Sequence, residues 1–139
     1  MNSDVLGNAF KAIQKAEDAF DTAKHDLKGG FTLAAVSRAY YAVFYCMTGL
    51  LLLHDIHAKT HRGVQTKFRE LFVKTDIFDF SVAQTIYVAF DLRQRADYDL
   101  NTDILPEEAS ELIKDAGIFL NVTKAYLQEL KAETQGKYP

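Results

Sequence analysis

Apolar residues recur every three or four positions along nearly the whole chain, and this spacing limits the possible folds more than any other feature. In the first segment these positions are Leu6, Phe10, Ile13, Phe20 and Leu27. Gly29-Gly30 then supplies the flexible backbone that commonly ends a helix. No segment alternates apolar and polar residues for long, as a half-buried strand would. We therefore predict an all-α fold with no sheet.

Four more helices are expected after the first. Residues 32–54 are apolar nearly all round, as in the central helix of a bundle. Thr60 can cap a short third helix, and Ser81 fits a capping box that would open a fourth helix ending near Tyr98. Pro106 suits the first turn of a fifth helix. Short loops between them predict an up-and-down bundle of four to five helices, and we expect one domain over residues 1–139.

Composition narrows the class of protein further. Of 139 residues, 48% are apolar and 25% charged, and the net charge is -3, which excludes a wholly basic surface but not a local basic patch. Cys46 is the only cysteine, so no internal disulfide can form. The N-terminus shows no signal-peptide pattern, and the most apolar segment, residues 39–53, is too short to span a membrane. We expect a cytoplasmic protein with no membrane association.

Charged residues interrupt the apolar pattern of the expected fourth helix. The stripe that begins with Val82 and Ile86 continues, at helical spacing, to Arg93 and Asp97. Removing these charges from water costs several kcal/mol unless they are paired or used. Because they are four positions apart, an intrahelical ion pair is one interpretation. The other is a polar cleft in which Asp97 orients Arg93 to bind phosphate while Tyr98 contacts a base or sugar.

The segment from residue 58 to 74 is the basic part of the chain. Lys59 and Arg62 lie at the start of the expected third helix, where free backbone amides favour anions. His61 between them is a candidate general acid, general base or phosphate donor. A solvated helix face is the alternative for these charges. His54 and His57 lie nearby without the spacing of a metal site, so we expect neither metal nor cofactor.

Four aromatic residues and an arginine fall within residues 37–45, and most of these rings are expected to pack in the core. Arg38 then needs a partner, and Asp97 on a facing helix is the natural candidate for a structural ion network. The chain has no glycine-rich phosphate loop, nucleophile elbow or paired-cysteine motif. A self-contained metabolic enzyme is therefore not expected.

Three segments taken together resemble HEPN-domain proteins (higher eukaryotes and prokaryotes nucleotide-binding). They are SRAYYAVFY at 37–45, KTHRGV at 59–64 and LRQRADYDL at 92–100, and residues 106–120 fit as well. The resemblance is closest to small single-domain prokaryotic members. It implies an all-α bundle that forms a homodimer, with polar motifs of both subunits lining a shared cleft.

Many HEPN proteins are metal-independent RNases whose motif is an arginine followed, after four to six residues, by a histidine. Others pair with a minimal nucleotidyltransferase as toxin and antitoxin, and in some pairs the partner adenylylates a tyrosine at the end of the motif. Arg93 matches the motif arginine, but Tyr98 stands where the histidine would be, and no histidine follows. This departure weakens the expectation of an RNase.

The leading hypothesis is a HEPN homodimer that binds nucleotide or RNA and acts with a nucleotidyltransferase partner in a toxin–antitoxin or stress-response module. Its binding residues would be Arg93, Arg62, Lys59, Tyr98 and Asp97. One alternative is a divergent metal-independent RNase that uses Arg93 and His61. Another is a non-catalytic protein-interaction bundle in which Arg38, Arg93 and Asp97 form an internal ion network.

Overall fold

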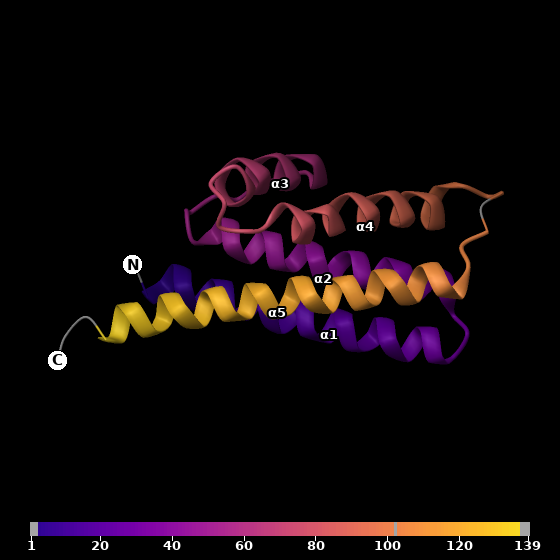
Figure 1. Cartoon of the computed structure of the whole chain (residues 1–139), viewed down its shortest axis with the longest axis horizontal. Coiled ribbons are helices and arrows are strands. Elements are labelled where there is room, and N and C mark those ends of the chain that lie inside the picture. The colour runs from indigo at the N-terminus through magenta and orange to yellow at the C-terminus, as the bar shows by residue number, and fades with distance from the viewer. Residues whose placement is uncertain (1–2, 102, 137–139) are drawn as a thin grey trace.

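The computed structural model describes residues 3–101 and 103–136, which form α-helices and one π-helical turn, with no strand among them. The elements are α1 (Ser3–Lys28), α2 (Thr32–Leu52), α3 (His61–Phe68), η1 (Arg69–Val73), α4 (Phe80–Tyr98) and α5 (Pro106–Gly136). Figure 1 shows α1, α2, α4 and α5 running up and down in turn, and α3 packs against α2. The predicted all-α bundle is confirmed.

Helix α2 is the centre of the bundle and contacts α1, α3, α4 and α5. Its fully buried positions cover more than half of its circumference, and Tyr41, Phe44 and Tyr45 on the remaining face are partly buried, which explains a sequence apolar nearly all round. Cys46 is also buried, and burial raises the pKa of its thiol to about 12. Among the described helices α2 alone is long and apolar enough to cross a membrane, but most of it is buried inside the bundle, like the core helix of a globular fold.

Side-chain caps begin α3 and α4, and the second of these differs from the prediction. Thr60 caps α3 as predicted, since its Oγ1 accepts a hydrogen bond from the Gly63 N–H at 2.9 Å. The predicted capping box at Ser81 is wrong, because Asp79 caps α4 and accepts from the Ser81 N–H at 3.2 Å. An aspartate two positions upstream offers the same kind of acceptor earlier in the chain. Pro106 begins α5 as predicted.

A cluster of phenylalanines fixes α3 and η1 to the rest of the bundle. Phe68 and Phe72 stack with ring centroids 5.2 Å apart, and Phe78 and Phe119 meet Phe68 at 5.2 and 5.8 Å. All four side chains are fully buried, and each contributes on the order of 2 kcal/mol through apolar burial. This packing sets where the first residue of α3, His61, lies over α2.

Candidate functional site

Three helices bring Tyr40, His61 and Arg93 together, and we call these residues the Tyr40 site. The hydroxyl of Tyr40, on α2, lies 2.5 Å from Nδ1 of His61, the first residue of α3. The guanidinium carbon of Arg93, on α4, lies 5.2 Å from the centre of the Tyr40 ring. The phenol is only 1% exposed. His61 is 21 positions after Tyr40, and Arg93 is 32 positions after His61. The buried Tyr40 ring therefore joins segments that are distant in the sequence.

Aromatic rings hold the imidazole and the guanidinium in place. Phe44 stacks on the His61 ring with centroids 4.5 Å apart, and Tyr41 meets it edge-on at 6.2 Å. The Arg93 guanidinium also lies 5.8 Å from the rings of Tyr41 and Tyr98. Cations over aromatic faces gain about 0.5–2 kcal/mol each, depending on how far they are desolvated. The run of aromatics at 37–45 therefore does more than fill the core, because it forms one wall of the site.

The charge state of the site follows from burial and from Arg93. Burial, assisted by the Arg93 charge, lowers the pKa of His61 from its ordinary value. Burial raises the pKa of Tyr40 to about 12, although Arg93 pulls it the other way. At neutral pH both His61 and Tyr40 are therefore neutral, and Arg93 carries the permanent positive charge of the site.

Arg93 and Asp97 form the intrahelical ion pair that their spacing allowed. Nε of Arg93 lies 2.9 Å from Oδ2 of Asp97, with the two side chains 13% and 32% exposed. The N–H is not directed at the carboxylate, so this nitrogen makes no hydrogen bond. The attraction is Coulombic, and it leaves a buried donor without an acceptor.

Two further buried donors lack acceptors in the described part of the chain, Nε2 of Gln65 and Nε of Arg69. Arg69 donates through Nη2 to Oε1 of Gln65 at 3.4 Å, and its guanidinium lies 4.1 Å from the Tyr87 ring. The Gln65 side chain is 7% exposed and lies close enough to Tyr40 to lower the pKa of the phenol. Sequence analysis missed Gln65, although it is a polar residue four positions after His61 and three before buried Phe68.

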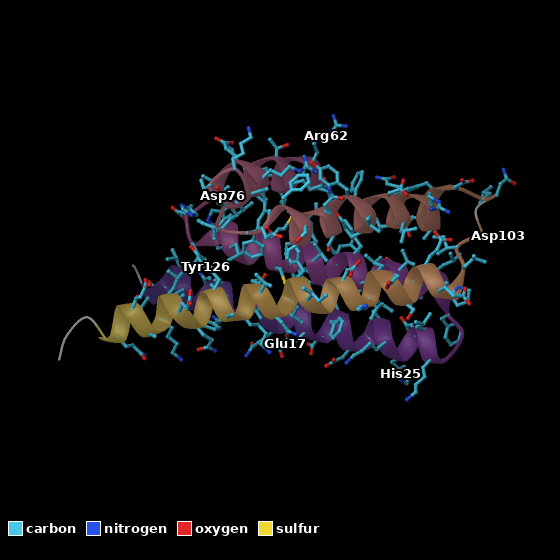
Figure 2. The ribbon with its side chains drawn as sticks, viewed as in Figure 1. Glu17, His25, Arg62, Asp76, Asp103 and Tyr126 are labelled. Carbon is cyan, nitrogen blue, oxygen red and sulfur yellow. The ribbon has the colours of Figure 1, made fainter. Side chains whose placement is uncertain are left out.

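The remaining predicted binding residues are on the surface. Lys59 and Arg62 are exposed, and Figure 2 shows Arg62 projecting outward from α3. Tyr98, the last residue of α4, is 68% exposed beside Arg93. The Arg38 guanidinium lies 5.0 Å from the Tyr41 ring.

The expected structural ion network between Arg38 and Asp97 does not form among residues 3–101 and 103–136, where no ion pair joins the two. Asp97 instead pairs with Arg93 on its own helix. The physical reason is distance along the chain, since a partner four positions away is already in reach and needs no second helix.

The three histidines around the α2–α3 loop face different partners. Nε2 of His57 lies 3.0 Å from Oδ1 of Asp55, His54 packs edge-on against Phe72, and His61 meets Tyr40. Over the described ranges, no three histidine, cysteine or acidic side chains come together as a metal site would require.

A groove of about 510 Å³ lies on another face of α4, between this helix and α5, and we call it the α4–α5 groove. Its lining includes Tyr87, Leu92 and the carboxylates of Asp91, Glu108, Glu111 and Asp115. Arg95 lies among them, with Nη1 3.7 Å from Asp91 and 3.6 Å from Glu108. The groove is acidic, whereas the Tyr40 site presents donors and a cation.

Comparison with known proteins identifies the family. The model of the HEPN domain matches residues 10–126, which include all of the Tyr40 site. The chain belongs to the HEPN-domain family. Each of the three segments on which the resemblance rested, 37–45, 59–64 and 92–100, contributes one residue of the site.

This HEPN protein has relatives among archaeal proteins. It is 42% identical over 117 residues to "Putative toxin MJ0142" of Methanocaldococcus jannaschii, covering 84% of this chain and 80% of the relative. It is 31% identical over 130 residues to "Putative toxin MJ0605" of the same organism, covering 94% and 96%. A UPF0332 protein of Archaeoglobus fulgidus is 32% identical over 112 residues, covering 81% and 89%.

Proposed function

We propose that the Tyr40 site binds phosphate groups of RNA or of a nucleotide. The observation that carries this proposal is that the buried polar atoms without a hydrogen-bond partner are donors and not acceptors. Every buried side-chain nitrogen or oxygen without a partner in the described residues is a donor: Gln65 Nε2, Arg69 Nε and Arg93 Nε. A phosphate brings acceptor oxygens and negative charge, so it is the ligand that complements them.

Residues on the surface near the Tyr40 site would also favour a phosphate-containing ligand. Lys59 and Arg62, exposed at the start of α3, would attract the backbone of a longer ligand and make its affinity salt-dependent. Tyr98 offers an exposed ring on which a base can stack. Asp97 would hold the Arg93 guanidinium in place by charge attraction, because its carboxylate lies beside Nε without accepting its N–H, and the N–H groups of Arg93 remain for the ligand.

The test is affinity for a fluorescently labelled single-stranded RNA, measured by anisotropy on Arg93→Ala and on Arg95→Ala as its matched control. Both variants remove one arginine from α4, but only Arg93 lies in the Tyr40 site. Removal of a charge-assisted hydrogen bond should weaken binding by about tenfold or more in Arg93→Ala, and Arg95→Ala should stay within about twofold. Equal weakening in both would overturn the proposal.

Thermal unfolding of the same pair separates binding from a purely structural ion pair. Arg93→Ala removes interactions with three aromatic rings, each worth about 0.5–2 kcal/mol, and the ion pair with Asp97, so a clear fall in melting temperature is expected. A large fall in stability with unchanged RNA affinity of the folded variant would favour the protein-interaction bundle instead.

A metal-independent RNase is the second candidate, favoured by the meeting of His61 and Arg93 at Tyr40. Both residue types serve in phosphodiester cleavage, one for proton transfer and one for charge stabilisation. Total tRNA would be incubated with an excess of protein in EDTA. Cleavage that disappears in both His61→Ala and Arg93→Ala would establish this activity, and no cleavage by the wild type would exclude it.

We further propose that the protein is a cytoplasmic homodimer that acts with a minimal nucleotidyltransferase in a toxin–antitoxin or stress-response module. The names of the two Methanocaldococcus jannaschii relatives support the toxin role. Light scattering of the purified chain would give its oligomeric state. Co-expression with a nucleotidyltransferase encoded beside it, followed by co-purification, tests the partner, and separate elution of the two proteins would count against it.

A further inference from the structure

The direction of one hydrogen bond decides what His61 can do. Tyr40 is buried, and its hydroxyl lies 2.5 Å from Nδ1 of His61, with the side-chain amide of Gln65 as the other polar group close to it. If Nδ1 carried the proton and donated, the phenolic hydrogen would have no acceptor in a buried place, which costs about 1–3 kcal/mol. The phenol therefore donates and Nδ1 accepts.

A neutral imidazole carries one N–H, so a proton-free Nδ1 places it on Nε2. We propose that Tyr40 is a positioning residue that holds His61 in the Nε2–H tautomer, so that His61 offers phosphate a hydrogen-bond donor and not a proton-accepting nitrogen. The part that concerns phosphate rests on the proposed function. The tautomer itself rests on geometry alone.

The neighbours of Tyr40 support this direction. The amide oxygen of Gln65 accepts a hydrogen bond from Arg69. The amide nitrogen of Gln65 is therefore the atom still free to interact, and it is a donor without an acceptor. The Gln65 side chain lies close enough to the phenol of Tyr40 to lower its pKa. A donor beside the phenolic oxygen cannot accept the phenolic hydrogen, which leaves His61 as its acceptor.

Charge agrees with this arrangement. Burial raises the pKa of Tyr40 to about 12 and lowers that of His61, so the pair is neutral at neutral pH and the phenolic proton stays on oxygen. With Nδ1 occupied and Nε2 protonated, neutral His61 can donate a hydrogen bond to a phosphate oxygen. It cannot take the proton of a ribose 2'-hydroxyl while Tyr40 holds it, so an RNase built on this site would need its base elsewhere.

Nitrogen NMR of protein labelled with ¹⁵N-histidine reads the tautomer directly at neutral pH. The chain has four histidines, and His61→Gln assigns the signals of interest. The wild type should show Nε2 in the range of a protonated ring nitrogen and Nδ1 in the range of an unprotonated one. Tyr40→Phe keeps the ring and removes the hydroxyl, so His61 should relax to a mixture of tautomers.

Tyr41→Phe is the matched control, because Tyr41 also packs against His61 but makes no described hydrogen bond to it. This variant should keep the wild-type signals. A proton on Nδ1 in the wild type overturns the proposal, and so does a Tyr40→Phe spectrum that matches the wild type. If Tyr40→Phe fails to fold, the wild-type spectrum still decides the question.

RNA affinity separates the tautomer from the proposed function. If both hold, Tyr40→Phe should weaken RNA binding by about fivefold, as expected for one ordinary hydrogen bond, and Tyr41→Phe much less. A wild type with the Nε2–H tautomer and no RNA binding would sink the phosphate-binding function and leave the role of Tyr40 intact.

Discussion

Helix α4 carries two arginines two positions apart in opposite surroundings. Arg93, 13% exposed, lies among the rings of Tyr40, Tyr41 and Tyr98. Arg95, 36% exposed, lies in the α4–α5 groove among carboxylates. Both arginines pair with carboxylates, but Arg93 also keeps a buried Nε–H without an acceptor, whereas Arg95 lies among several acidic groups.

The region with room for a ligand is not the region whose chemistry suits an anion. The α4–α5 groove has room for a ligand, but its four carboxylates would repel a phosphate. The Tyr40 site is closely packed, yet it includes a buried donor that lacks an acceptor, Nε of Arg93, and the side chain of Gln65 brings a second such donor close to the phenol of Tyr40. The sign of the surrounding charge, and not the size of the hollow, indicates where an anion binds.

The largest difference between the two regions should appear in stability. Tyr40→Ala removes a fully buried ring and should lower the free energy of unfolding by about 3–5 kcal/mol. Tyr87→Ala removes a ring that is 50% exposed and should cost about 1 kcal/mol, mainly its interaction with Arg69. Urea unfolding measures both, and an equal fall in stability would contradict the difference in packing between the two rings.

The salt dependence of RNA affinity should differ next. The double variant Lys59→Ala, Arg62→Ala should lower the slope of log K against log salt by about 0.7 for each phosphate that these side chains neutralise in the wild type. Glu108→Gln with Glu111→Gln removes two charges from the α4–α5 groove and should leave the slope nearly unchanged. A larger change from the groove variant would place the RNA on the wrong side of α4.

The smallest effect is a decrease of stability in mild acid. The folded pKa of His61 is lowered, so the unfolded chain binds the proton more readily. Stability is therefore fully present above the unfolded value of about 6.5 and falls as the pH drops from there toward the folded pKa. His61→Gln should lack this part of the acid effect, whereas His25→Gln, exposed near the end of α1, should keep it. Melting temperatures across this range decide it, and a parallel decline in wild type and His61→Gln would refute it.

Much of the fold follows from local signals in the sequence. Helical spacing, the Thr60 cap and Pro106 at the first turn of α5 each depend on residues within one or two turns. The predicted start of α4 is one residue late and its predicted cap two residues late, because Asp79 and Ser81 are both good caps and the pattern alone does not rank them.

The site was only partly predictable. Charge on an apolar stripe marked Arg93 and Asp97, and the position of His61 marked a candidate donor. The contact of His61 with Tyr40 depends on how the phenylalanine cluster seats α3 on α2, which is a property of tertiary packing. Gln65 carried no signal except its place among apolar neighbours. The predicted partner of Arg38 is wrong because rings can hold a guanidinium as carboxylates do.

The central claim is that the anion binds at Arg93 and not at Arg95. The most direct measurement follows the side-chain Nε–H signals of ¹⁵N-arginine protein by NMR during titration with a short single-stranded oligoribonucleotide. The Arg93 signal should move saturably, with the Arg95 signal nearly still. Movement of Arg95 with Arg93 unchanged, or of neither at saturating RNA, would contradict the account.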